Sequence, residues 1–240
     1  MMHTTTPYRV LTWLLVCIGL LSVGHLAVIF ARHGLGFDYL FGLNALFDIN
    51  DEQNVPTLFS SLMLLGAGGL LFVSARLANR LRLFWYGLAI GFVILAICET
   101  AAVHEPLLFV MRGKVSPGTA QLAKNLTFRF ANYRPQLALL GVGLALAIWL
   151  FLRSIDWRTR WLFVLAGVLY LGGAMGVDEL TAAAHGTGRP QWFNTLCTTC
   201  EEVLEMGGAA TFIFALLDRL ARLHPGIGVR LVPEDVRGTG

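Results

Sequence analysis

Long apolar stretches alternate along this chain with short segments rich in arginine or in acidic residues. The hydrocarbon core of a bilayer is about 30 Å thick, so a helix that crosses it needs about 20 mostly apolar residues. Six stretches meet or approach this length, namely 10–31, 57–75, 83–102, 136–152, 161–180 and 198–217. The pattern predicts an all-α protein, a polytopic bundle of about six transmembrane helices. We expect a single domain over residues 1–222 and a polar tail over 223–240.

The amino-acid composition also indicates which class of protein this is. Hydrophobic residues make up 56% of the chain, charged residues only 14%, and the mean hydropathy is +0.66. Soluble domains carry about 25% charged residues, so these values indicate a membrane protein and exclude a disordered or collagen-like chain. The net charge of +3, without a basic patch interleaved with aromatic residues, argues against a nucleic-acid partner.

The distribution of charge predicts the orientation. If the N-terminus is cytoplasmic, eleven of the eighteen Lys and Arg residues fall on the cytoplasmic side, three of them in each of the short loops 76–82 and 153–160. Short loops weigh most in the positive-inside rule, so we expect both termini in the cytoplasm. Eleven of the fifteen acidic residues then lie on or near the outer side. Insertion does not explain this second bias, because Asp and Glu contribute little to it.

Several of these acids fall inside predicted spans. Counting back from Asp218 at the inner interface puts Glu201, Glu202 and Glu205 at membrane depth, with Glu205 about 10 Å in. Glu99 lies at a similar depth in the third span. More acids and two histidines stand near the outer boundary, namely His104, Glu105, Asp178, Glu179 and His185.

An ionised acid at the membrane centre costs about 2.5–3.5 kcal/mol. Ion pairs with arginine, shared protons or a bound cation would offset that cost. Carboxylates beside imidazoles suit Zn, Mn or Fe, which favours a divalent transition-metal site facing the periplasm. The candidate ligands are Glu99, His104, Asp178, His185, Glu202 and Glu205, surrounded by Glu52, Glu105, Glu179 and Glu201. The alternative is a structural ion-pair network with the outer-side arginines Arg112, Arg129, Arg134 and Arg189.

Three smaller features each have two interpretations. The acidic segment 48–54 is either a calcium loop or, as we favour, the start of a helix capped by Asn54 with Pro56 in its first turn. Cys197 and Cys200, at the expected outer start of the last helix, form either a redox pair or two inert thiols. His25, in the first span, either ligates a haem with His104 or His185 or hydrogen-bonds a neighbouring helix. Glycine pairs such as Gly141/Gly143 and Gly172/Gly173 indicate close helix packing.

Three motifs together carry a resemblance. They are Asp48-x3-Glu52-x-Asn54-x-Pro56-Thr57, then Glu99 with His104-Glu105, then Glu201-Glu202-x2-Glu205-Met206-x-Gly208. Over residues 45–217 the chain resembles a group of bacterial inner-membrane, multi-pass proteins. That group has no established reaction, so the resemblance implies the fold, the location and the importance of these positions but no activity.

The sequence thus leaves three functions open. The first is a membrane protein that binds a divalent transition metal. The second is a non-catalytic accessory subunit of a larger respiratory or photosynthetic complex, with its acids paired to arginine. The third is a proton- or ion-coupled transporter. Besides the lipid bilayer, the expected partners are a larger membrane complex or further copies of the chain.

Overall fold

The computed structural model describes residues 5–35, 46–47, 54–101, 134–177 and 191–224. These residues form helices and contain no strand. The long helices are α1 (Thr5–Gly34), α3 (Val55–Leu77), α4 (Arg82–Thr100), α7 (Arg134–Ser154), α8 (Trp157–Leu171) and α10 (Gln191–Leu223). A six-residue π-helix, η1 (Gly172–Val177), continues α8. The prediction of an all-α fold is therefore confirmed.

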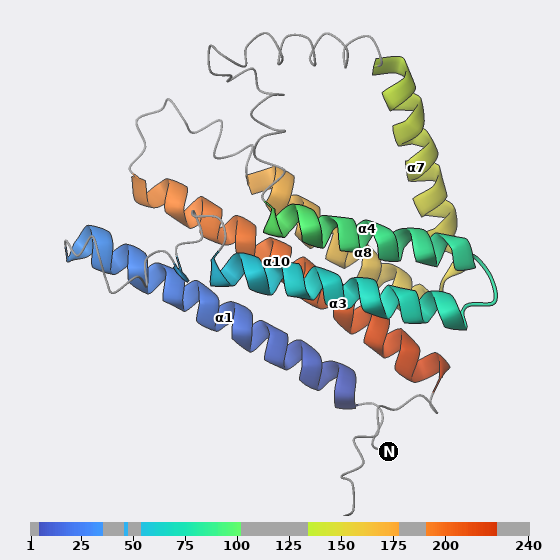
Figure 1. The fold of residues 1–240 in the computed structure, drawn as a ribbon, viewed down its shortest axis with the longest axis horizontal. Helices are drawn as coiled ribbons and strands as arrows, with labels where there is room; N and C mark the ends of the chain where they lie inside the picture. Colours follow the sequence, from blue (N-terminus) through green and yellow to red (C-terminus); the bar gives the residue numbers. More distant parts are fainter. Residues whose placement is uncertain (1–4, 36–45, 48–53, 102–133, 178–190, 225–240) are drawn as a thin grey trace, which may run out of the picture.

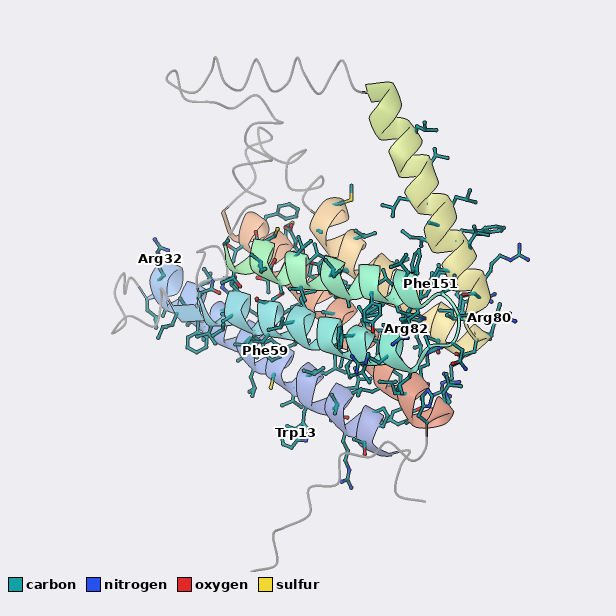
Figure 2. The ribbon with its side chains drawn as sticks, turned by 45° about the vertical axis from the view of Figure 1, so that its right-hand side comes forward. Trp13, Arg32, Phe59, Arg80, Arg82 and Phe151 are labelled. Carbon is teal, nitrogen blue, oxygen red and sulfur yellow. The ribbon has the colours of Figure 1, made fainter. Side chains whose placement is uncertain are left out.

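The helices correspond to the six predicted spans. By length and composition, α1, α3 and α4 are each apolar enough to cross a membrane. The apolar part of α7, Gly141–Ser154, is shorter, and α10 carries the three glutamates of the motif. Large apolar side chains point outward from the bundle, as Trp13 does in Figure 2 with 69% of its surface exposed. An apolar exterior of this kind suits lipid and confirms a membrane protein.

The bundle is built around α10, the last and least apolar of the long helices. It packs against α1, α3 and α8 together with η1, while α3 and α4 form an antiparallel hairpin (Figure 1). Ile18, Leu64, Met206, Ala210 and Ile213 are among the buried residues where α1, α3 and α10 meet. A second, aromatic cluster around Trp85 joins α4, α7 and α8.

In contrast, α7 joins the bundle only near its C-terminal end. Phe151 stacks on Phe84 with ring centroids 4.5 Å apart and meets the edge of Trp85 at 4.8 Å. The rest of α7 extends away from the other helices (Figure 1), and its apolar residues are exposed, from Leu139 at 74% to Leu150 at 54%. The interpretation of Gly141 and Gly143 as packing contacts is wrong for the described residues, because nothing lies within 4 Å of either position.

The bundle has two chemically different ends. We call the end formed by the start of α1, the α3–α4 turn, the α7–α8 turn and the C-terminus of α10 the basic end. It carries Arg76, Arg80, Arg82, Arg153, Arg158, Arg160, Arg219 and Arg222. We call the other end, with Glu99, Glu201, Glu202 and Glu205, the acidic end. Figure 2 shows Arg80 and Arg82 at the basic end and Arg32 at the opposite end of the bundle.

Candidate functional site

The acidic end is organised by α10. Glu201, Glu202 and Glu205 follow one another over little more than one helical turn, and residues three or four apart share a face. All three side chains are partly buried, and Met206, directly after Glu205, is fully buried against α1 and α3. The packing of Met206 therefore fixes the helix rotation that turns these glutamates toward the bundle.

Glu99 reaches the same place from α4. It lies in electrostatic range of both Glu202 and Glu205, a juxtaposition that brings together residues about a hundred positions apart. The end of α4 is held to α3 by Ser61, whose hydroxyl donates to the carbonyl of Ala96 at 2.9 Å and bonds the Thr100 hydroxyl at 2.7 Å. The structure thus brings together Glu99, Glu201, Glu202 and Glu205 of the predicted set.

Tyr170 joins these carboxylates, although sequence reasoning did not select it. This residue of α8 is in electrostatic range of Glu205, Glu99 and Glu202. It is brought close by Gly208, where an added Cβ would lie 2.7 Å from the Tyr170 nitrogen and 2.8 Å from the Ala166 oxygen. No side chain fits in that space, so α8 and α10 touch backbone to backbone.

The π-helix lies beside the same glutamates. An added Cβ on Gly173 would lie 2.7 Å from the Glu201 carbonyl oxygen and 3.0 Å from Cγ of Glu205. The expected close packing is therefore confirmed at Gly173, although Gly172 has open space around it. Turns of π-helix are rare and are frequently found at functional sites. Here the π-helix ends at Val177, one residue before the predicted ligand Asp178.

Two of the smaller features now have an observed geometry. Asn54 is the N-cap of α3, and its Oδ1 accepts from the Thr57 nitrogen at 2.8 Å, which confirms the predicted cap. His25 is fully buried on α1, and its Nδ1 donates to the Phe47 carbonyl at 3.2 Å. That bond is the kind of inter-segment contact expected of a membrane histidine. The haem hypothesis stays a prediction.

The cysteine pair lies in a different local setting from the expected one. Cys197 and Cys200 are free thiols in α10, and Cys200 is exposed. The prediction that α10 starts near residue 198 is wrong, because the helix begins at Gln191. Both thiols therefore lie beyond the first turn, outside the reach of the positive end of the helix dipole.

The remaining predicted residues lie outside the described ranges. They are Glu52, His104, Glu105, Asp178, Glu179 and His185, and the side chains of Arg112, Arg129, Arg134 and Arg189. Within the described part of the chain, no three His, Cys, Asp or Glu side chains converge in a way that could hold a metal ion. A metal site would therefore need ligands from residues outside the described ranges.

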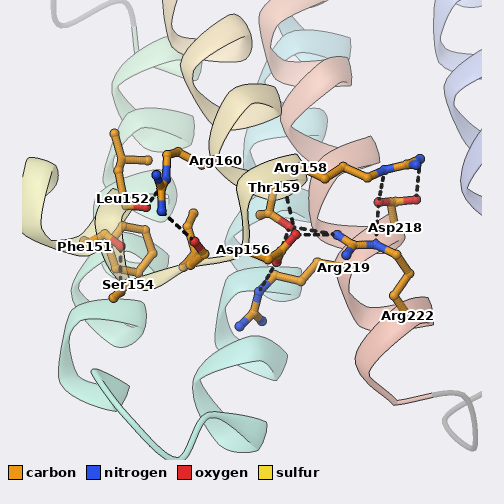
Figure 3. A network of polar contacts seen from close by, with 11 residues as sticks. Phe151, Leu152, Ser154, Asp156, Arg158, Thr159, Arg160, Asp218, Arg219 and Arg222 are labelled. Atoms are coloured by element: carbon orange, nitrogen blue, oxygen red, sulfur yellow. Dashed lines mark hydrogen bonds and ion pairs between the residues drawn. The ribbon is translucent and has the colours of Figure 1, made fainter.

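The basic end contains an ion-pair network that sequence reasoning also missed (Figure 3). Asp218, nearly buried on α10, accepts from Nε and Nη2 of Arg158 and from Nε of Arg222, each at 3.0 Å. Arg158 also donates to the Tyr8 hydroxyl at 3.0 Å, which ties the start of α1 to α8 and α10. Asp218 is therefore a structural residue at the meeting point of three helices.

Asp156 completes this network from the start of α8. It is the N-cap, accepts from the Thr159 nitrogen at 3.1 Å and pairs with Nη2 of Arg222 at 3.0 Å. Partial burial raises the pKa of this carboxyl, but the hydrogen bonds from Thr159 and Arg222 outweigh burial and hold its pKa below the ordinary value. The signal in the sequence was Asp156-x-x-Thr159 directly before an apolar stretch, a pattern typical of helix N-termini.

Comparison with known proteins places the chain in a family. No curated protein and no solved structure matches it. A family match covers residues 10–220, which include both ends of the bundle and all three motifs of the acidic end. The family has no assigned function, which confirms the expectation of a group without an established reaction. The chain belongs to the family described as Domain of unknown function (DUF8692).

Proposed function

We propose that this protein binds a divalent transition metal ion, iron, manganese or zinc, within the membrane at its acidic end. Glu99, Glu202 and Glu205 supply carboxylate ligands from the described helices. His104, Asp178 and His185 complete the coordination from segments outside them. Glu52, Glu105, Glu179 and Glu201 surround these ligands and orient them.

One observation carries the proposal, the convergence of Glu99 on Glu202 and Glu205 inside an apolar bundle. The charged groups that act on Glu202 and Glu205 are other carboxylates. Negative charges that are partly removed from water repel one another and are costly at membrane depth. A divalent cation offsets two negative charges at once, and carboxylates with imidazole suit these metals. Tyr170 and the π-helix lie beside the same carboxylates.

The orientation follows from charge. We propose that the basic end faces the cytoplasm, because its two short turns carry three arginines each. The acidic end then opens to the other side of a bacterial inner membrane, where it can take up metal from the periplasm. A single cysteine introduced at Asn79, in the α3–α4 turn, would test this in a background without the four natural cysteines. It should react with an impermeant maleimide only after the membrane is opened.

Metal analysis of the purified full-length protein tests the proposed function. We expect near-stoichiometric iron, manganese or zinc after purification in mild detergent. Glu202→Gln and Glu205→Gln should lose most of this metal, since the loss of a ligand typically weakens binding at least tenfold. Glu234→Gln, in the polar tail, is the matched control and should keep it. Protein that is well folded and carries no metal after supplementation would sink the proposal.

A second candidate, an accessory subunit of a larger membrane complex, is favoured by α7. This helix presents apolar side chains on its exposed faces, and among the described residues it contacts the bundle near Phe151. A membrane partner could cover it, and the acids would then play a structural part. Consistent copurification of one other membrane chain, lost on Leu139→Lys but kept in Glu205→Gln, would support this candidate over the metal-binding one.

A further inference from the structure

A cavity of about 930 Å³ opens at the basic end, away from the glutamates. It lies between the α3–α4 turn and the C-terminal ends of α7 and α10. Its polar lining comes from Asn79, Arg80, Ser154, Arg219 and His224, and the rest comes from leucines with Ala78, Trp85 and Ile155. Among the described residues, no acidic side chain belongs to this lining. The cavity therefore combines positive charge with apolar walls.

The guanidinium of Arg219 is the group of the lining that most needs a ligand. Its guanidinium carbon lies 4.7 Å from the centre of the Trp85 ring, a cation–π contact. Its Nε is buried and donates no hydrogen bond to any described residue. The carboxylate beside it, Asp156, is 4.0 Å from Nε, too far for a hydrogen bond. Figure 3 shows the guanidinium of Arg219 turned away from Arg222.

The charge of Arg219 is thus poorly compensated. The oxygens of Asp156 already accept from Thr159 and Arg222. Burial lowers the pKa of the Arg219 guanidinium, the charge of Asp156 offsets part of this effect, and the nearby charge of Arg222 adds to it. An arginine keeps its proton in proteins, so the site holds a partly desolvated cation with an unused donor. An anion with several oxygen acceptors would satisfy it.

The place of the cavity in the bundle indicates which anion. It lies where α3 ends at Leu77 and α4 begins at Arg82, the level at which the two spans leave the membrane. Three leucines of the lining are exposed, Leu81 at 45%, Leu150 at 54% and Leu223 at 48%. A free phosphate would use the arginines and leave these leucines in contact with water. An anionic lipid has phosphate oxygens that can bind the arginines and acyl chains that can cover the leucines.

We propose that this cavity binds an anionic phospholipid, with Arg219 and Arg80 contacting the phosphate and the leucines of the lining contacting the acyl chains. Basic pockets between helices on the cytoplasmic side are suited to such headgroups. The site is independent of the metal proposed at the acidic end, since the two lie at opposite ends of α10.

Lipid titration of the full-length protein in nanodiscs tests the proposal. In discs of phosphatidylcholine, increasing fractions of phosphatidylglycerol should raise the unfolding temperature in a saturable way. Arg219→Gln and Arg80→Gln should each weaken the apparent affinity about tenfold, the effect expected when one charge-assisted hydrogen bond to the phosphate is lost. Arg80 is exposed in a turn, so its variant tests the site even if Arg219→Gln folds poorly.

Arg153→Gln is the matched control. Arg153 lies at the same end and also stacks on a tryptophan, 4.7 Å above Trp149, but it does not line the cavity. Its variant should respond to the lipid as the wild type does. An equal loss in Arg153→Gln would overturn the proposal in favour of general surface attraction. The same stabilisation by inorganic phosphate in phosphatidylcholine discs would overturn it in favour of a free anion.

Discussion

The carboxylates at the two ends of α10 have opposite electrostatic surroundings. At the basic end, Asp218 accepts three hydrogen bonds from two arginines, each at 3.0 Å. At the acidic end, about 20 Å further along the helix, Glu205 is in electrostatic range of Glu202, Glu99 and Glu201. A carboxylate whose charge is offset by its neighbours holds helices together. Carboxylates gathered with one another repel, so a bound cation would stabilise them.

The largest expected effect comes from the contact that brings Tyr170 to the acidic end. Gly208→Val would place side-chain atoms against the α8 backbone, because the Cβ alone lies 2.7 Å from the Tyr170 nitrogen. The helices would have to separate, and we expect a loss of about 3 kcal/mol in the free energy of unfolding. Denaturation in mild detergent measures this loss. Gly207→Ala, one position earlier with nothing within 4 Å, should be nearly neutral, and similar losses in both variants would refute the argument.

Removing the charge of Asp218 comes next. Asp218→Asn would remove the negative charge that Arg158 and Arg222 share, and one of its two acceptor oxygens, and should lower the free energy of unfolding by about 1–3 kcal/mol. The exposure of both arginines keeps the loss at this level, since water can hydrate them. Asp218→Glu, which keeps the charge, should recover part of the stability. If Asp218→Asn were as stable as the wild type, the ion-pair network at the basic end would not stabilise the fold.

The same exchange of acid for amide should have the opposite sign at the acidic end. In metal-free protein, Glu205→Gln removes one of several neighbouring carboxylates and should raise the free energy of unfolding by about 1 kcal/mol. The same denaturation assay, run with a chelator, measures the gain. A loss comparable to that of Asp218→Asn would mean that Glu205 is paired as Asp218 is, and the contrast between the two ends would disappear.

The smallest effect is the pH dependence of Asp156. Its pKa is lower in the folded protein than in the unfolded chain, where it is near 3.9. The stabilisation is therefore fully present above pH 4 and is lost as the pH falls through the folded-state value. We expect less than about 1 kcal/mol, because a third of the side chain is exposed. The stability of Asp156→Asn relative to wild type should rise between pH 5 and 3, and a constant difference would refute the assignment.

Much of the fold could be predicted because the hydrophobic pattern is long and clear. All six predicted spans coincide with helices, and the Asn54 cap was recognisable from Asn-x-Pro before an apolar stretch. The ends of the helices were harder to predict. The helix α10 begins seven residues before the predicted position, since a helix does not end where its apolar stretch meets the interface.

The candidate site could be predicted only in part. Glutamates at membrane depth stand out in a sequence, so Glu99, Glu202 and Glu205 were identified. Their convergence depends on how α4, α8 and α10 pack, which no local pattern encodes. Gly208 is a motif position and Gly207 is not, but the sequence does not show that Gly208 is the one that touches α8. Tyr170 was missed because its contacts also depend on helix packing. An aromatic residue in an apolar helix gives no sign in the sequence of which polar residues surround it.

The central position of α10 also has a consequence for how the protein is made. It is the last of the described helices to leave the ribosome, and three glutamates make it the hardest to transfer into lipid alone. Yet it packs on α1, α3 and α8, which precede it in synthesis. These helices must already be in the bilayer when α10 inserts, so that its glutamates pack against protein instead of hydrocarbon. Of the described helices, α10 would therefore be the last to enter the bilayer.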